Sequence, residues 1–210
     1  MTEDGLIHIV DDDRDVRDGL GFLLSSLGLE IATHNSAVTF LEALDAAKGR
    51  HEGLGCILAD VRMPGMSGLE LLDELAQRKC PLPVIMITGH GDVPMAVKAM
   101  RAGAIDFFEK PVQGMALIER IKDALELSRI RATEAGDRAE ITTKIDSLTA
   151  REAEVARAVV RGLQNKQIAH ELGISPKTVE IHRHNAMSKL ACGSTAEMVR
   201  RLVAAGWGET

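Results

Sequence analysis

Short apolar runs recur along the first 125 residues, and each is followed by a stretch with apolar residues at every third or fourth position. The runs are almost continuously hydrophobic, as in strands buried on both faces of a parallel sheet, and the stretches between them have the period of amphipathic helices. Strands are predicted at 6–10, 29–33, 56–60, 84–88 and 105–108, with helices at 14–27, 36–47, 68–77, 93–102 and 115–125. The pattern predicts an α/β domain with a doubly wound (βα)5 parallel sheet.

The pattern changes after residue 147, where only helical periods occur. Thr149 and Glu152 have the spacing of a capping box at the start of a helix that carries apolar residues to Leu163. A short helix at 165–172 ends at Gly173, and Ser175-Pro176 opens a third helix that runs to about residue 190. With a last helix at 194–205, this part is predicted to be an all-α four-helix domain that contains a helix-turn-helix.

The segment between these two parts is polar and charged, with scattered alanines and Gly136. We therefore predict a domain at residues 1–125, a linker at 126–146 and a second domain at 147–210. The linker is expected to be partly helical, as a continuation of the preceding helix that frays or breaks near Gly136.

Composition narrows the class of protein. Hydrophobic residues make up 45% of the 210 positions and charged residues 27%, which is typical of a globular chain. No apolar run approaches the roughly 18 residues of a membrane span, and the polar start is unlike a signal peptide, so we expect a cytoplasmic protein without a membrane partner. The three cysteines have no metal-binding spacing, and the 2% aromatic content argues against a stacking platform for single-stranded nucleic acid.

Charge is divided unevenly between the two parts. Residues 1–146 carry 16 basic and 25 acidic residues, a net charge of −9, whereas residues 147–210 carry 9 and 6, a net charge of +3. An acidic first part and a mildly basic second part suggest two tasks, the second of them directed at phosphate.

Residues able to carry chemistry stand where the predicted strands end. Asp11 and Asp12 follow the first strand, Asp60 ends the third, and Thr88 and Lys110 follow the fourth and fifth. In open parallel sheets, ligands bind beyond these ends. Clustered carboxylates repel one another and favour a hard cation such as Mg²⁺. A carboxylate can attack phosphorus when a metal ion and a lysine neutralise the developing charge. The alternative to such a reactive site is a carboxylate–lysine network that only stabilises the loops.

These residues lie within a wider resemblance. Residues 1–125 resemble the receiver domain of two-component response regulators, and the last 64 residues resemble the LuxR-type helix-turn-helix. The combination is similar to the NarL/FixJ class, most of all to its FixJ branch, through the strings ITGHGDVPMAVKAM, AGAIDFFEKP and ISPKTVEIHRHNAMSKL. The resemblance implies a flavodoxin-like strand order 2-1-3-4-5, in which the first and third strands are neighbours and the strand-end carboxylates converge.

The resemblance also implies roles for single residues. It makes Asp60 the phosphoacceptor, with Asp11, Asp12, the Asp60 carboxylate and the main-chain carbonyl of Arg62 as ligands of Mg²⁺. Thr88 corresponds to the switch hydroxyl, Phe107 to the switch aromatic residue and Lys110 to the phosphate-pairing lysine. The Lys110-Pro111 peptide bond is expected to be cis. The protein would catalyse its own phosphoryl transfer and slow dephosphorylation without being a metabolic enzyme.

The third helix of the second domain is the expected reader of double-stranded promoter DNA. Its candidate contacts, with one more from the preceding helix, are Lys166, Lys177, Thr178, Glu180, Ile181, Arg183, His184 and Asn185. Val179, His182, Met187 and Leu190 are expected to face the core.

The sequence departs from the family pattern at two positions of this helix. Ala186 predicts looser packing of the helix, and Glu180 stands where many relatives carry a basic residue. A carboxylate repels phosphate but accepts a hydrogen bond from cytosine.

The function predicted from this reading is a phosphorylation-activated, DNA-binding transcription regulator. Its expected partners are a sensor histidine kinase, promoter DNA, a second copy of the chain after phosphorylation and RNA polymerase.

A phosphatase or mutase of the haloacid dehalogenase type is an alternative to this predicted function, since such enzymes also use a strand-end Asp. They need a second Asp two residues later, however, where this chain has Arg62. A third possibility is a module that acts by protein contacts alone.

Overall fold

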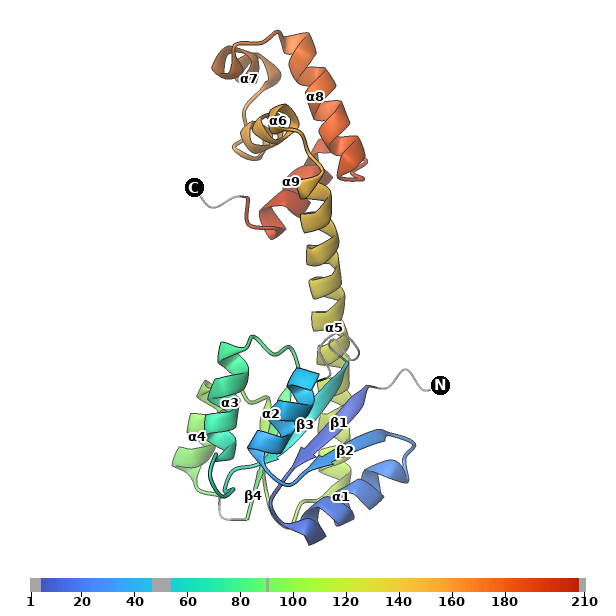
Figure 1. The fold of residues 1–210 in the computed structure, drawn as a ribbon, viewed down its shortest axis with the longest axis vertical. Helices are drawn as coiled ribbons and strands as arrows, with labels where there is room; N and C mark the ends of the chain where they lie inside the picture. The colour runs from blue at the N-terminus through green and yellow to red at the C-terminus, as the bar shows by residue number, and fades with distance from the viewer. Residues whose placement is uncertain (1–4, 47–53, 90, 208–210) are drawn as a thin grey trace. The chain divides into compact units, whose positions relative to one another are not determined.

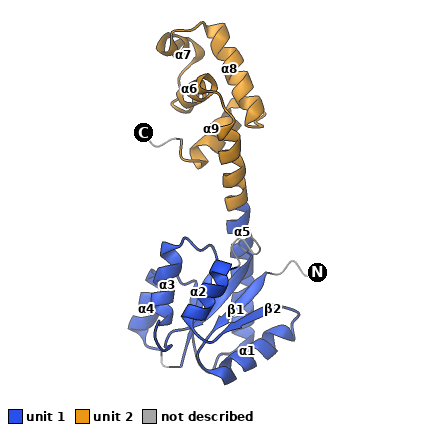
Figure 2. Ribbon diagram, viewed as in Figure 1, with its two compact units in different colours: residues 1–133 blue, residues 134–210 orange. Residues whose placement is uncertain are grey.

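The computed structural model describes residues 5–46, 54–89 and 91–207. The chain forms two compact units, at residues 1–133 and 134–210 (Figure 2). In the described residues, no helix is both long and apolar enough to cross a membrane.

The first unit contains a parallel sheet of five strands in the order β2-β1-β3-β4-β5 (Figure 1). The strands are β1 (Leu6–Val10), β2 (Glu30–His34), β3 (Gly55–Asp60), β4 (Val84–Thr88) and β5 (Asp106–Glu109). The predicted α/β fold and strand order are confirmed. Because Val10 pairs with Ala59, and Asp60 with Ile87, the carboxyl ends of β1, β3 and β4 lie level with one another.

Helices cover both faces of this sheet (Figure 1). The apolar residues of α1 (Arg14–Ser25) and α5 (Gly114–Asp146) pack against one face. Those of α2 (Ala37–Ala46), α3 (Gly68–Gln77) and α4 (Val93–Arg101) pack against the other. Strand β3 is buried along its whole length, as its unbroken apolar sequence predicts.

The loop between β3 and α3 is tightly constrained. Ser67 caps α3 in a reciprocal capping box with Glu70. A Cβ atom on Gly68 would lie 2.1 Å from the carbonyl oxygen of Asp60, so only glycine allows the helix to start this close to the strand. The sequence at 67–68 therefore holds the end of β3, and Asp60 with it, in place.

Helix α5 differs from the sequence prediction. It runs unbroken through Gly136, and the linker expected at 126–146 is helical throughout. The expected break is wrong because one glycine costs only about 1 kcal/mol relative to alanine in a helix, whereas its neighbours are mostly good helix formers. Early in the helix, the buried Ser128 Oγ accepts a hydrogen bond of 3.0 Å from the amide of Gly55, which ties α5 to the start of β3.

The second unit is all-helical. Helices α6 (Ala150–Val160), α7 (Asn165–Leu172), α8 (Pro176–Lys189) and α9 (Thr195–Ala204) surround one aliphatic core. The end of α5 contributes Ile141 and Ile145 to the same core. Gly173, with a φ of 65°, forms the turn between α7 and α8, and the Ser175 side chain caps α8. The predicted helical domain is confirmed, with α5 as an added element.

Candidate functional site

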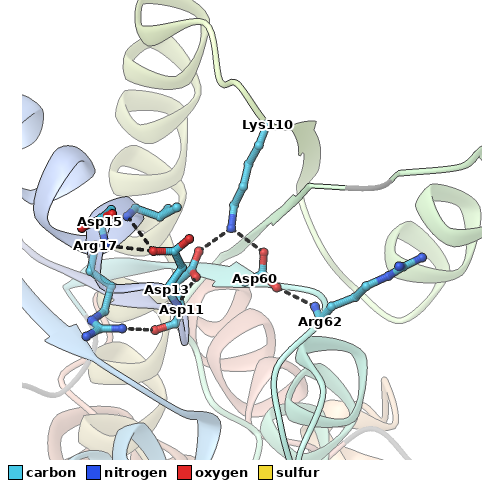
Figure 3. A network of polar contacts seen from close by, with 8 residues as sticks. Asp11, Asp13, Asp15, Arg17, Asp60, Arg62 and Lys110 are labelled. Atoms are coloured by element: carbon cyan, nitrogen blue, oxygen red, sulfur yellow. Dashed lines mark hydrogen bonds and ion pairs between the residues drawn. The ribbon is translucent and has the colours of Figure 1, made fainter.

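The ends of β1, β3 and β5 bring two carboxylates and one ammonium group together (Figure 3). Lys110 Nζ donates hydrogen bonds to Asp11 Oδ2 at 2.6 Å and to Asp60 Oδ1 at 2.7 Å. Asp11 is 3% exposed and Asp60 5%. One lysine thus bridges two buried acids, which leaves a formal charge of −1 when all three groups are ionised.

Asp11 is held by its own loop. Its Oδ1 accepts from the amide of Asp13 at 3.0 Å, and its main-chain carbonyl accepts from Arg17 Nη1 at 2.7 Å (Figure 3). The Asp13 side chain in turn caps α1 by accepting from the amide of Asp15 at 2.9 Å. Arg17 and Asp13 were not among the site residues predicted from the sequence. The place of Asp13 directly before a predicted helix is the one signal that indicated a cap.

Opposing electrostatic effects act on the buried carboxyl group of Asp60. Its Oδ2 accepts from the Arg62 amide at 2.6 Å, so both carboxylate oxygens have partners. Burial raises the pKa of Asp60, and the hydrogen bond and charge of Lys110 oppose that rise without cancelling it. For Lys110, burial lowers the pKa, but the hydrogen bonds and charges of Asp11 and Asp60 together raise it. Lys110 therefore stays protonated and favours the ionised form of Asp60, which is the nucleophilic form.

The donor chemistry at this site suits a hard divalent cation. Asp11 and Asp60 supply carboxylate oxygens, and the net negative charge favours added positive charge. Asp12, in the same loop, is exposed to solvent. Within the ranges the structure describes, no three acidic, histidine or cysteine side chains are gathered as a metal-binding group, so Asp12 has not joined Asp11 and Asp60.

Thr88 and Phe107 lie close together beside this centre. Thr88 is fully buried, and its carbonyl accepts from the Lys110 amide at 2.7 Å. Phe107 is half-buried and packs against the core on the α2–α4 face. Gly91 lies next to both: a Cβ atom there would be 3.0 Å from the Phe107 ring and 3.1 Å from Thr88 Cγ2. The Lys110-Pro111 bond is cis, as expected.

Helix α8 carries the second set of candidates. Lys177, Glu180, Ile181, His184 and Asn185 are exposed, as is Lys166 on α7. Thr178 and Arg183 are half-buried and have partners within the protein: Thr178 Oγ1 is 2.8 Å from Ser175 Oγ, and Arg183 Nη1 donates to Asn165 Oδ1 at 3.2 Å. Val179 and Leu190 are fully buried in the core, where Ala186 is also buried, and His182 and Met187 are half-buried.

Comparison with known protein families also divides the chain into two parts. Residues 7–122 match the response regulator receiver domain, and residues 146–202 match the bacterial regulatory proteins of the luxR family. Together these matches cover 173 of the 210 residues.

Individual relatives match over almost the whole length. The chain is 47% identical to the transcriptional regulatory protein FixJ of Azorhizobium caulinodans over 98% of its length and 95% of that protein. It is 44% identical to FixJ of Rhizobium meliloti, with 98% of each chain covered.

Solved structures of response regulators are also similar to this chain over almost its whole length. The low-resolution structure of the response regulator StyR has a TM-score of 0.77 at 44% identity, with 94% of this chain and 98% of that chain covered. Full-length FixJ from B. japonicum has a TM-score of 0.58 at 40% identity, with 98% of each chain covered. These relatives are regulators rather than metabolic enzymes. The chain belongs to the response regulators: it is a FixJ-like transcription regulator with a receiver domain and a LuxR-type DNA-binding domain.

Proposed function

We propose that this regulator is activated when Asp60 accepts a phosphoryl group from the phosphohistidine of a sensor kinase. An Asp60 carboxylate oxygen forms a bond to phosphorus while the phosphorus–nitrogen bond of the donor breaks and the histidine nitrogen is released. The observation that carries the proposal is the bridge from Lys110 to two buried carboxylates. Lys110 would neutralise the oxygens of the transferred group.

Mg²⁺ is the proposed cofactor, which Asp11, Asp12, Asp60 and the main-chain carbonyl of Arg62 would hold. Asp12, exposed on the same loop, would have to turn towards Asp11 and Asp60 to do so. A bound Mg²⁺ would neutralise charge that develops on the phosphoryl oxygens. Asp11 is already positioned by the Asp13 amide and by Arg17. The negative charge left beside Lys110 supports a cation at this site.

Thr88 and Phe107 are the proposed switch. Phosphate on Asp60 would attract the Thr88 hydroxyl, and Phe107 would rotate inward as that hydroxyl moves. The close packing of both residues around Gly91 supports a coupled movement. Such a movement shifts an equilibrium between two conformations rather than creating a new fold.

The proposed result is a homodimer that binds double-stranded promoter DNA and recruits RNA polymerase. Helix α4 offers a surface for pairing, because Val93, Val97 and Met100 are 77%, 43% and 46% exposed. Apolar side chains grouped on one helix favour contact with another protein surface. The DNA contacts proposed on α8 are Lys177, Thr178, Glu180, Ile181, Arg183, His184 and Asn185, with Lys166 on α7.

Phosphate incorporation tests the proposal directly. The protein is incubated with acetyl phosphate and Mg²⁺, and phosphorylated chains are separated by a phosphate-affinity gel. We expect labelling of wild type, none of Asp60→Asn, and none when the metal is chelated. Asp18→Asn is the matched control, because it removes an exposed carboxylate on α1 whose partner is Arg14. Labelling of Asp60→Asn at the wild-type rate would refute the assignment, and a wild-type protein that is not labelled at all would favour a module that acts by protein contacts alone.

A further inference from the structure

The exposed face of α8 contains residues of unlike chemistry. Thr178 and Arg183 are half-buried and hydrogen-bonded to other residues of the protein, so the exposed side chains among the candidate contacts on α8 are Lys177, Glu180, Ile181, His184 and Asn185. Two of these, Glu180 and Ile181, are unusual on a helix that would approach a polyanion. One is negatively charged and the other is apolar, and neither gains from a phosphate contact.

Ile181 is 53% exposed and is the one large hydrophobic residue of α8 that projects into solvent. An aliphatic side chain in this position gains free energy only by contact with another apolar group. In the major groove of DNA, the apolar group on the base edges is the C5-methyl of thymine. Ile181 therefore fits a T·A base pair.

Glu180 is exposed and adjacent to Ile181. An ionised carboxylate can only accept hydrogen bonds, so it repels phosphates and needs a donor. The amino group of cytosine N4 is the usual partner of Glu in the major groove. Exposed lysines at 166 and 177 carry the positive charge that can hold the flanking phosphates while Glu180 reaches the bases.

Arg183 has a different role in this arrangement. Its hydrogen bond to Asn165 joins α8 to the first residue of α7. Because the two helices pack against the same core, this bond helps set the angle at which Glu180 and Ile181 are presented. Arg183 therefore helps to position the helix, beside its proposed contact with DNA, and no base is assigned to it.

We propose that α8 reads a T·A base pair through Ile181 and a neighbouring C·G base pair through Glu180. This inference rests on the proposed function, because it assumes that α8 enters the major groove. It adds the identity of two base pairs in each half-site and the residue that selects each of them.

The test begins with the full-length protein, treated with acetyl phosphate and Mg²⁺, and a pool of duplexes with a randomised centre. Selection defines the preferred site, and fluorescence anisotropy at one salt concentration then measures affinity. Replacing the selected thymine by deoxyuridine removes one methyl group, and we expect wild-type affinity to fall about fourfold. Ile181→Ala should bind the thymine and deoxyuridine duplexes equally.

Glu180→Gln tests the second contact without changing the size of the side chain. Glutamine pairs well with adenine, so the variant should select A·T where wild type selects C·G, and its preference for cytosine should fall about tenfold. Lys177→Ala is the control: it should weaken binding to all duplexes alike and lower the salt dependence, with base preferences unchanged. Thermal unfolding is measured for each variant to show that it is folded.

The outcomes separate this inference from the function on which it rests. If wild type selects a site but deoxyuridine has no effect and Glu180→Gln keeps its cytosine, the two assignments are wrong and sequence-specific binding stands. If wild type enriches no sequence at all, the proposed function fails, and this inference with it.

Discussion

At the scale of single residues, the receiver site combines burial with incomplete charge balance. Asp11 and Asp60 are both nearly inaccessible, and Lys110 is the ammonium group that bridges them. Burial disfavours the charged form of an acid, whereas a close cation favours it. Here burial has the larger effect on Asp60, whose pKa is raised.

Asp60→Asn should stabilise the folded receiver at neutral pH. A raised pKa means that ionised Asp60 destabilises the folded state above that pKa, whereas below the unfolded pKa both states hold a neutral carboxyl. Asparagine has nearly the same shape without the charge. We expect a higher melting temperature than wild type at pH 7 and a difference that shrinks as pH falls through the pKa of Asp60. The measurement is thermal unfolding from pH 3.5 to 8, with Asp18→Asn as control. A lower melting temperature at pH 7 would contradict this account.

Gly91→Ala should uncouple phosphorylation from the switch. The added methyl group would lie 3.0 Å from the Phe107 ring and 3.1 Å from Thr88 Cγ2, which is too close without displacing one of them. It would fill space that Phe107 needs in order to rotate. We expect phosphorylation at about the wild-type rate but a dimer population reduced several-fold, measured by sedimentation. Thr88→Ala is the comparison, since it should also be phosphorylated without dimerising. Wild-type dimerisation of both variants would eliminate this coupling route.

At the scale of elements, the start of α6 is joined to the end of α8 through one acid. Glu152 is buried, accepts from the Thr149 amide at 2.8 Å in a capping box, and accepts from Lys189 Nζ at 2.7 Å. The Lys189 hydrogen bond, followed by that of the Thr149 amide, lowers the pKa of Glu152. One side chain thus caps one helix and anchors the helix that carries the DNA contacts.

Glu152→Gln should destabilise the DNA-binding domain by about 1–2 kcal/mol, because it removes a charged acceptor from the cap and from Lys189. The lowered pKa means that this stabilisation is present above the unfolded pKa of the Glu carboxyl and is lost as pH falls through the folded one. The difference between wild type and variant should therefore disappear in acid. Trp207, the single tryptophan, packs against Arg157 in this unit, so its fluorescence reports unfolding there. An equal difference at pH 3.5 and pH 7 would show that the charge is not responsible.

At the scale of the whole molecule, phosphorylation of the receiver has to raise the affinity for DNA, because a single DNA-binding domain is expected to bind weakly. The net charge of residues 147–210 is only +3, from 9 basic and 6 acidic residues. One helix-turn-helix of this charge makes few phosphate contacts, whereas a dimer reads two half-sites and makes its second contact within the same complex.

Phosphorylation should therefore act mainly by raising the dimer population. A fragment of residues 134–210, which keeps Ile141 and Ile145 in the core of the second unit, should keep the sequence preference but bind more weakly than phosphorylated full-length protein, on a roughly palindromic site. The measurement is sedimentation alongside binding titrations at matched salt, with and without acetyl phosphate. A phosphorylated protein that saturates its operator while monomeric would exclude this mechanism.

The sequence alone determined the sheet and the set of strand-end residues. Uninterrupted apolar runs required a sheet covered on both faces, and parallel strands bring all their carboxyl ends to one edge. The pattern therefore placed Asp11, Asp60 and Lys110 at one edge of the sheet, the strand order implied by the receiver resemblance made them neighbours, and the structure brings them together.

Only the tertiary structure decided how the side chains at that edge are used. The bridge from Lys110 to both carboxylates depends on distances between loops far apart in the sequence, which periodicity does not encode. The contact of Arg17 with the Asp11 carbonyl and the exposure of Asp12 depend on the conformation of one loop, which periodicity does not encode either. The hydrogen bond from Arg183 on α8 to Asn165 on α7, 18 residues earlier in the chain, has the same cause. Local propensity sets small preferences of about 1 kcal/mol, and packing and hydrogen bonding between elements override them.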